Sequence, residues 1–240
     1  MVGPTEQIRE LKTQAKNRRD RGLAGYPRAV ALLRDAIGIA RAALLEATGD
    51  DRSTELATEL ADCYGIIGGI ERRWAVDGPG EEREAHLRES IRAYDAGYEL
   101  ESNPQYRINN SYNLLNRLLV RLLLRPDLFD ATDAIDLGED IALIHFRTAL
   151  QQAADVITEQ LAGPRRGDYW ALADLALLQL LLGGTDPAVA YAPFNQLSPP
   201  AFAYSSVLAG LRTLADLPMS ASRSIREASA LLESRLQSLR

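Results

Sequence analysis

The fold of this chain is decided by a pattern that is clearest in residues 90–97, SIRAYDAG. Ser90, Tyr94 and Gly97 place a small, a large and a small side chain at offsets of 0, 4 and 7, which share one face of a helix. Small residues let a second helix approach closely, and the large ring fills the groove to the next pair of helices. The same spacing recurs at Ala29-Leu33-Ala36, Ala142-Phe146-Ala149 and, more loosely, Ala188-Ala192-Asn195. The chain therefore carries a repeated helical element.

The residues around these segments predict a protein that is almost entirely helical. Ala, Leu, Arg and Glu dominate wherever apolar residues are periodic, and the alternating runs that signal strands are not found. A capping side chain precedes a proline at Asn103-Pro104, Asp186-Pro187 and Ser198-Pro199, and Ser224 with Glu227 reads as a capping box. The predicted helices lie near residues 4–20, 26–47, 53–75, 81–101, 104–124, 133–162, 168–182, 187–196, 199–216 and 222–238.

Helices joined by short connections fold as successive antiparallel hairpins. The 0-4-7 spacing is typical of the second helix of a tetratricopeptide hairpin, and the first-helix half of that pattern appears in Leu60-Ala61-Tyr64-Gly68 and Trp170-Ala173-Asp174-Leu177. The spacing between anchors exceeds the roughly 34 residues of a regular repeat. We therefore predict an all-α fold, an α-solenoid of about five divergent tetratricopeptide-like hairpins. It forms one domain over residues 1–240, in which residues 218–240 cap the array.

Three segments carry a more specific resemblance: residues 61–73 (ADCYGIIGGIERR), 91–100 (IRAYDAGYEL) and 106–110 (YRINN). They resemble the tetratricopeptide-like TRAF-binding region of apoptosis signal-regulating kinases, and similar regions of bacterial proteins linked to signalling or defence. The resemblance covers about residues 55–215. It implies a regulatory or scaffolding module. The Gly-rich loop, the β3 lysine and the His-Arg-Asp triplet of a kinase are missing from the sequence.

The composition disfavours an enzyme. The chain has 240 residues but only two His and one Cys, which are His86, His145 and Cys63. Zinc sites, haem ligation and nucleophilic catalysis by Ser-His or Cys-His groups depend on these residue types. We therefore expect a protein that is not an enzyme and that holds no metal and no cofactor.

Charge and hydropathy limit the partners. A net charge of −6 repels the phosphates of nucleic acids and the surface of anionic membranes. The most apolar stretch, residues 114–124, is interrupted by Asn116, Arg117 and Arg121 and is shorter than the roughly 20 apolar residues that cross a bilayer. Residues 1–10 lack the pattern of a secretion signal. We expect a cytoplasmic protein that binds neither nucleic acid nor membrane.

The candidate binding site lies on the helix expected over residues 104–124. Its polar stripe consists of Asn109, Asn110, Asn113, Asn116, Arg117 and Arg121. Amides donate and accept hydrogen bonds and guanidinium groups pair with carboxylates, so a stripe on the concave face of a solenoid could hold a peptide backbone or an acidic terminus. The alternative is structural: the amides bond loop carbonyls and the arginines pair with neighbouring acids.

A second cluster is acidic, at Asp133, Asp136, Glu139 and Asp140. Clustered carboxylates are the residues that divalent-cation sites and acid–base catalysis need. Acidic residues in the first turns of a helix also stabilise its macrodipole. We favour this second explanation over a metal site.

These observations leave three hypotheses for the function. The first is a non-catalytic scaffold or regulatory module of a signalling or defence assembly, which binds a protein or a peptide. The second is a sensor that changes conformation when it binds a small ligand or a peptide, and the third is a helical enzyme that uses only carboxylates. A homo-oligomer is also possible, because the last helix carries Leu231, Leu232, Leu236 and Leu239 and could pair with another subunit.

Overall fold

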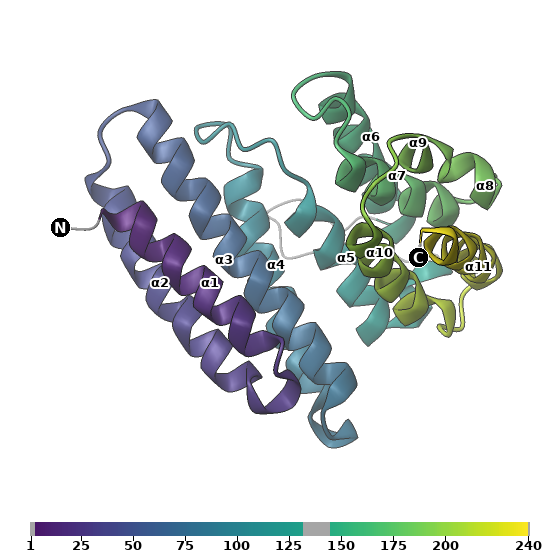
Figure 1. Ribbon diagram of the computed structural model, residues 1–240, viewed down its shortest axis with the longest axis horizontal. Helices are drawn as coiled ribbons and strands as arrows, with labels where there is room; N and C mark the ends of the chain where they lie inside the picture. Colours follow the sequence, from purple (N-terminus) through teal and green to yellow (C-terminus); the bar gives the residue numbers. More distant parts are fainter. Residues whose placement is uncertain (1–2, 132–144, 240) are drawn as a thin grey trace. The chain divides into compact units, whose positions relative to one another are not determined.

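The computed structural model describes residues 3–131 and 145–239 (Figure 1). The chain divides into two compact units, residues 1–124 and 125–240. Within the described ranges all regular secondary structure is helical, which confirms the prediction of an all-α fold. The prediction of one repeat domain over 1–240 stays a prediction, and each unit is described by itself below.

Unit 1 contains five α-helices: α1 (Pro4–Arg19), α2 (Tyr26–Glu46), α3 (Asp50–Asp77), α4 (Arg83–Glu101) and α5 (Tyr112–Leu124). Short 3₁₀ turns at Gly22–Ala24 and Gly80–Glu82 close the first two hairpins. Helix α1 pairs with α2, α3 pairs with α4, and α5 packs on α4 at the end of the unit (Figure 1).

The first helices of the hairpins form one layer of unit 1. Helix α1 contacts α3, and α3 contacts α5, whereas the second helices α2 and α4 make little or no contact with each other. When hairpins stack more closely through their first helices than through their second helices, the array curves toward the first helices. The first helices then line its concave surface. We call the surface formed by α1, α3 and α5 the first-helix face.

The 0-4-7 anchors of unit 1 are buried, and those on α4 lie where the two helices of one hairpin touch. Ala29, Leu33 and Ala36 on α2 are fully buried, and Ser90 on α4 donates a hydrogen bond to the carbonyl oxygen of Gly68 on α3 at 2.7 Å. A Cβ atom on Gly68 would lie 2.8 Å from the ring of Tyr94. The glycine is therefore required for the close approach of α3 and α4, as the small-large-small pattern predicts.

Substitution of Gly97, the last residue of the 0-4-7 pattern on α4, is expected to cause a measurable loss of stability. A Cβ atom there would lie 2.5 Å from the side-chain amide of Asn113, so we expect Gly97→Ala to lower the free energy of unfolding by about 2 kcal/mol despite the better helix propensity of alanine. The matched control is Gly38→Ala on α2, where nothing lies within 4 Å of the new Cβ. It should leave stability unchanged or raise it by up to about 1 kcal/mol. Equal effects of the two changes in urea unfolding would contradict this packing role.

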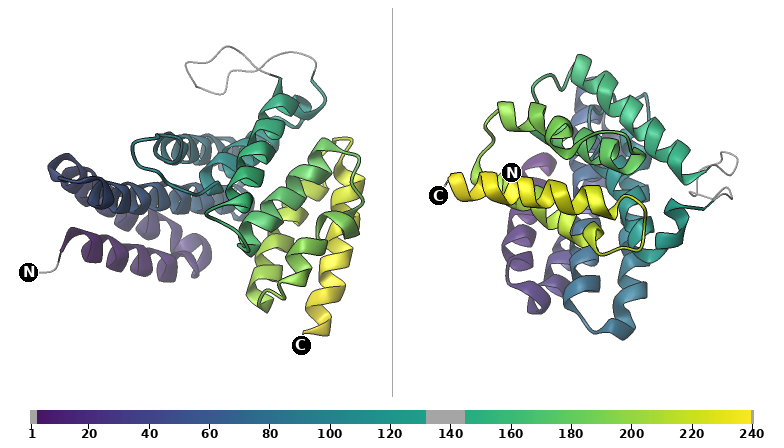
Figure 2. Two further views of the ribbon diagram at one scale, coloured as in Figure 1. Left: turned by 90° about the horizontal axis from the view of Figure 1, so that it is seen from above. Right: turned by 90° about the vertical axis from the view of Figure 1, so that its right-hand side faces the viewer.

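Unit 2 begins with a 3₁₀ turn at Pro126–Phe129. Its α-helices are α6 (Phe146–Ala162), α7 (Tyr169–Leu182), α8 (Pro187–Ala190), α9 (Ala192–Gln196), α10 (Ala201–Ala215) and α11 (Ser222–Ser238). Helices α6 and α7 form one hairpin and α10 and α11 another, and both views of Figure 2 show α10 and α11 running side by side. Helix α11 also contacts α7 and α8, so its apolar side is used within unit 2.

Two of the predicted helix starts are confirmed. The Asp186 carboxylate accepts hydrogen bonds from the backbone N–H groups of Ala188 and Val189 and caps α8. The helix expected from residue 168 begins at Tyr169, with Asp168 as its N-cap. In both cases a side-chain oxygen satisfies N–H groups that the helix itself leaves without a partner.

The prediction of a helix over 104–124 is wrong for residues 104–111, because α5 begins at Tyr112. Asn103 forms a tight turn instead, in which its side-chain oxygen accepts from Gln105 N–H at 2.9 Å. Arg107 adopts a positive φ of 49°, and Asn110 accepts from the N–H of Tyr112 at 3.2 Å. Local side-chain bonds thus compete with the helix.

Three other expectations differ in detail. The helix expected over 187–196 is divided at Tyr191 into α8 and α9, because Pro193 has no N–H to continue the hydrogen-bond ladder. Helix α11 begins at Ser222, so Ser224 and Glu227 form no capping box. Helix α10 begins at Ala201 after Pro200 rather than at Pro199, because Ser198 has a φ of 49°. Most of the first half of the helix expected over 133–162 lies outside the described residues.

Candidate functional site

The structure does not bring the six residues of the polar stripe together on one face. Asn109 and Asn110 lie in the loop before α5, where Asn109 is exposed and Asn110 is half-buried. The other four residues lie on α5 and are at most 9% exposed; they are Asn113, Asn116, Arg117 and Arg121. These four side chains therefore contact other parts of the chain, and a partner would meet the exposed residues around them.

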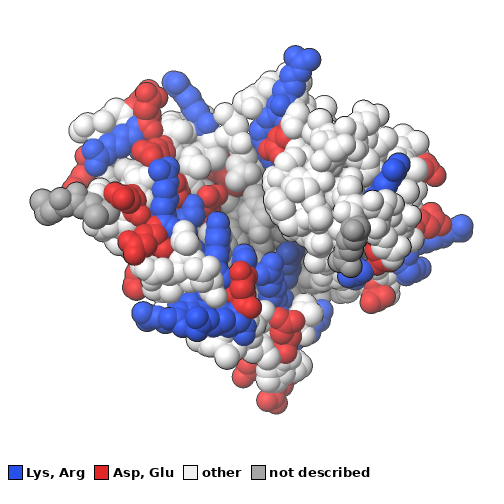
Figure 3. All heavy atoms as spheres, viewed as in Figure 1, with Lys and Arg blue, Asp and Glu red and all other residues white. Residues whose placement is uncertain are grey.

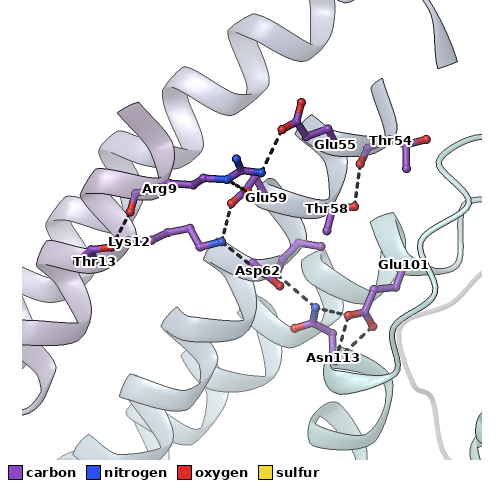
Figure 4. A network of polar contacts seen from close by, with 11 residues as sticks. Arg9, Lys12, Thr13, Thr54, Glu55, Thr58, Glu59, Asp62, Glu101 and Asn113 are labelled. Carbon is purple, nitrogen blue, oxygen red and sulfur yellow. Dashed lines mark hydrogen bonds and ion pairs between the residues drawn. The ribbon is translucent and has the colours of Figure 1, made fainter. Parts of the chain in front are cut away.

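Asn113 is held by a buried carboxylate (Figure 4). Its side-chain amide donates to Glu101 Oε1 at 2.8 Å, and Glu101 Oε2 accepts from the backbone N–H of Asn113 at 3.2 Å and of Leu114 at 3.3 Å. The same amide donates to the carbonyl oxygen of Ala61 on α3 at 3.3 Å. Glu101, at the end of α4, thus caps the start of α5, and Asn113 ties both helices to α3.

The buried position of Glu101 changes its acidity. Burial raises the pKa of Glu101 to about 7, although the N–H groups of Asn113 and Leu114 act in the opposite direction. Removal from water disfavours the charged carboxylate, while hydrogen bonds from N–H groups favour it. Glu101 is therefore a carboxylate that titrates near neutral pH and that serves as a structural acceptor.

The two arginines of the stripe pair with α4. Arg121 makes a bidentate ion pair with Asp95, at 3.1 Å and 2.9 Å. The guanidinium carbon of Arg117 lies 4.1 Å from the centroid of the Tyr98 ring, and its Nε lies 3.6 Å from Asp95. Such stacking and bidentate pairing are typical of structural arginines. The contacts favour the structural explanation of the stripe; its role in partner binding stays a prediction.

A second polar network joins α1 to α3 (Figure 4). Lys12 Nζ lies 2.6 Å from Glu59 Oε2 and 2.8 Å from Asp62 Oδ2, and Arg9 Nε lies 2.5 Å from Glu59 Oε1. Burial alone would raise the pKa of Glu59, but Lys12 and Arg9 outweigh it and lower that pKa. Burial would likewise lower the pKa of Lys12, but Asp62 and Glu59 raise it. Both groups are therefore charged partners in the fold.

Two further side chains join α3 to α5, those of Tyr112 and Arg72. Tyr112 is 41% exposed, and its ring lies over Gly65, whose added Cβ would be 3.0 Å away. Next to it, Arg72 on α3 donates to Asn116 Oδ1 at 3.0 Å. The charges of unit 1 are mixed: Figure 3 shows Lys and Arg side chains in a broken row across the side that carries α1, with Asp and Glu side chains among them.

The residue pattern did not predict that Arg72 and Tyr112 lie beside the buried part of the stripe. The run Gly65-Ile66-Ile67-Gly68-Gly69 is the signal that could have found them, because glycines along one side of a helix let side chains of the neighbouring helices reach its backbone. The rings of Tyr94 and Tyr112 lie 5.9 Å apart between their centroids, in an edge-to-face arrangement. The glycines thus permit close packing of these rings on α3.

Two of the three reactive residues, His86 and Cys63, lie within the packing of unit 1. His86 Nδ1 lies 2.6 Å from Glu71 Oε2, and its ring stacks on Trp74 with centroids 4.3 Å apart. Cys63 is fully buried, and burial raises the pKa of its thiol to about 12, so it is no nucleophile. In the described ranges no three His, Cys, Asp or Glu side chains gather as metal ligands do. The acidic cluster at Asp133, Asp136, Glu139 and Asp140 lies outside these ranges.

No helix in the part of the chain that the structure describes is both long enough and apolar enough to span a bilayer. Comparisons with curated proteins and with solved structures found no match. The sequence model of the tetratricopeptide repeats-sensor family matches residues 3–122, which is half of the chain and contains the helices of unit 1 except for the last two residues of α5. The chain therefore belongs to the tetratricopeptide repeats-sensor family.

Proposed function

We propose that unit 1 is a non-catalytic module that binds a protein or peptide partner on its first-helix face. It would serve as a regulatory or scaffolding part of a signalling or defence assembly in the cytoplasm. The observation that carries this proposal is that α1 contacts α3 and that α3 contacts α5. These three helices form the first-helix face, and the side of them that faces away from α2 and α4 is left for a partner. Repeat arrays use this concave surface for binding.

The polar networks support such a role by keeping the face in place. Lys12 and Glu59 hold α1 against α3, and Glu101 with Asn113 holds α3, α4 and α5 together. A surface whose helices are already fixed loses little conformational entropy when a partner binds, and this favours affinity. The stripe residues on α5 would thus contribute to binding by holding the helices of the first-helix face in place.

The resemblance to the TRAF-binding region of apoptosis signal-regulating kinases supports the same proposal, since it covers about residues 55–215 and implies a regulatory module. Tetratricopeptide-type repeats generally mediate protein interactions, which agrees with the family match. A TRAF-like partner is the finer form of this hypothesis.

Site-specific photo-crosslinking tests the proposal. A photo-reactive phenylalanine analogue replaces Tyr112, which is exposed beside the first-helix face, and in a matched control it replaces Leu45 on α2, which is 90% exposed. In the native host we expect a discrete protein adduct from position 112 and none from position 45. Adducts from both positions, or from neither, would contradict partner binding on this face.

A ligand sensor is the second candidate. The description of the family as a sensor favours it. A ligand that binds the folded state raises the melting temperature. A thermal-shift screen in which no small molecule moves that temperature would count against the sensor.

A further inference from the structure

Four cationic side chains of α1 share one face of the helix. They lie at offsets of 0, 3, 7 and 10, and they are Arg9, Lys12, Lys16 and Arg19. The first two pair with Glu55, Glu59 and Asp62 on α3, which follow them in the sequence by 46 to 50 residues (Figure 4). We call the line along which these two helix faces meet the α1–α3 seam. In its first half, acidic side chains balance the cations.

The second half of the α1–α3 seam has no such acidic partners on α3. The α3 face that carries the three acids continues with Ile66, Gly69 and Arg73. The offset of 50 residues that the ion pairs of the first half show places Ile66 opposite Lys16. It likewise places Gly69 opposite Arg19. The ladder of ion pairs therefore stops halfway, and Arg73 adds a third cation where an acid would continue it.

We call Lys16, Arg19 and Arg73 the basic triad. Lys16 and Arg73 are exposed, and within the described ranges neither forms an ion pair. Arg19 is half-buried and pairs with its neighbour Asp20 at 2.8 Å, in an exposed pair of the kind that adds little to stability. The ammonium of Lys16 and the guanidinium of Arg73 are therefore accessible to a partner.

Two members of the basic triad lie near one hydroxyl, that of Tyr26. Burial and a hydrogen bond to Asp77 raise the pKa of Tyr26 to about 12, whereas the charges of Arg73 and Arg19 act in the opposite direction. A charge has such an effect only on a nearby group. The ends of α1 and α3 thus bring two cations to one place, and the acid beside them, Asp77, is already bonded to Tyr26.

The helix dipole explains only part of this arrangement. Lys16 and Arg19 lie in the last turn of α1, where cations stabilise a helix. The last turn of α3 contains no basic residue, so the dipole does not account for Arg73. Cations that lie close together repel one another, and an anion bound among them relieves the repulsion.

We propose that the second half of the α1–α3 seam binds an acidic segment of a protein partner, whose Asp and Glu carboxylates pair with the basic triad. These carboxylates would continue the ladder that Glu59 and Asp62 form in the first half. Arginine and carboxylate groups match in hydrogen-bond chemistry as well as in charge. This inference rests on the proposed function, and it gives the chemistry of the partner segment.

The length of the basic triad suits a short peptide. Ile66, which stands opposite Lys16, is seven residues before Arg73, and this corresponds to about 10 Å along a helix. An extended peptide covers that length with about three residues. A phosphate polymer fits less well, because the net charge of −6 repels it.

The test uses hexaglutamate as the probe and hexaglutamine as its neutral control, with the full-length chain. Binding is followed by the backbone amide NMR signals of Lys16 and Arg73, and the signal of Arg52 at the start of α3 serves as a reference. We expect hexaglutamate to shift the first two signals and hexaglutamine to leave them unchanged. Equal shifts by the two peptides would overturn the assignment to charge.

A pair of double variants separates the basic triad from net charge. Lys16→Gln with Arg73→Gln removes two positive charges from the triad, and the matched control, Arg34→Gln with Arg52→Gln, removes two from exposed positions elsewhere in unit 1. We expect hexaglutamate to bind the first variant at least about tenfold more weakly and the control as tightly as the unaltered chain. Equal losses in the two variants would overturn the site.

A carboxylate placed within the chain should compete with the partner. Gly69→Glu puts an acid opposite Arg19, and its Cβ atom would lie 3.5 Å from the nearest atoms, an ordinary contact distance. The control is Gly38→Glu on α2, where the Cβ atom meets open space. Both changes add one negative charge and replace a helical glycine. We expect Gly69→Glu to bind hexaglutamate at least about tenfold more weakly than Gly38→Glu does, with a melting temperature that is equal or higher. Equal affinities would contradict the register on which the proposal depends.

Two further probes distinguish other occupants. Tighter binding of inorganic phosphate or of single-stranded hexathymidylate than of hexaglutamate, with the same dependence on Lys16 and Arg73, would overturn the acidic peptide as the ligand. The outcome of crosslinking from position 112 is independent of these arms. Hexaglutamate binding without a crosslinked partner contradicts the proposed function alone, whereas a crosslinked partner with equal losses in the two double variants contradicts the basic triad alone.

Discussion

Replacement of Lys12 by methionine is expected to lower the free energy of unfolding by about 3 kcal/mol. The Lys12 side chain is 10% exposed, and it lies 2.6 Å from the carboxylate of Glu59, which is 9% exposed. Methionine has a similar length but no charge, so the change leaves a buried carboxylate with Arg9 as its remaining partner. The loss should appear as a lower midpoint of urea unfolding, followed by far-ultraviolet circular dichroism.

The double variant Lys12→Met with Glu59→Met distinguishes a lost partner from lost packing. When both charges are replaced by apolar groups of similar size, stability should return to within about 1 kcal/mol of the unaltered chain. The surface control is Arg88→Ala, which breaks an exposed ion pair with Glu84 and should cost at most about 0.5 kcal/mol. A double variant as unstable as Lys12→Met would show that charge pairing is not the cause.

A rise in pH from about 5 to about 8 is expected to weaken the fold through Glu101. Burial raises its pKa from 4.5 to about 7, so between these values the folded chain binds a proton that the unfolded chain has released. The stabilisation is complete below pH 4.5 and is lost as the pH rises through 7. A shift of this size corresponds to about 3 kcal/mol.

Glu101→Gln is the control for this pH dependence. Glutamine keeps one acceptor oxygen for the N–H groups at the start of α5 but does not titrate, so the difference in stability between the two proteins should change with pH over this range. The lowered pKa of Glu59 acts in the opposite direction, with stability lost as the pH falls below 4.5. A constant difference between pH 5 and 8 would show that Glu101 does not titrate in the fold.

The residue pattern predicted the fold better than it predicted the site. The 0-4-7 spacing placed Ser90, Tyr94 and Gly97 at a hairpin contact, and Ser90 and Tyr94 meet Gly68 there. Such patterns are local, since three residues on one helix face need no knowledge of the rest of the chain. Helix ends such as the one capped by Asp186 are local too.

The start of α5 could not be predicted in the same way. Asn103-Pro104 has the residue types of a helix cap, yet the helix starts eight residues later, at Tyr112. Its actual cap is Glu101, which belongs to the preceding helix and reaches Asn113 and Leu114 across the loop. A cap supplied by another element is a tertiary contact, which the local pattern does not contain.

The sequence by itself determined that the chain is all-α, that its hairpins are of the tetratricopeptide type in unit 1, and that α5 carries polar residues among leucines. These properties follow from side-chain size and spacing within single helices. Only the tertiary structure decided that Arg121 faces Asp95 on α4 and that Asn113 faces Glu101, so that the part of the polar stripe on α5 is buried. Whether a polar side chain meets a partner, a neighbouring helix or water depends on which elements pack beside it, and those elements come from distant parts of the chain.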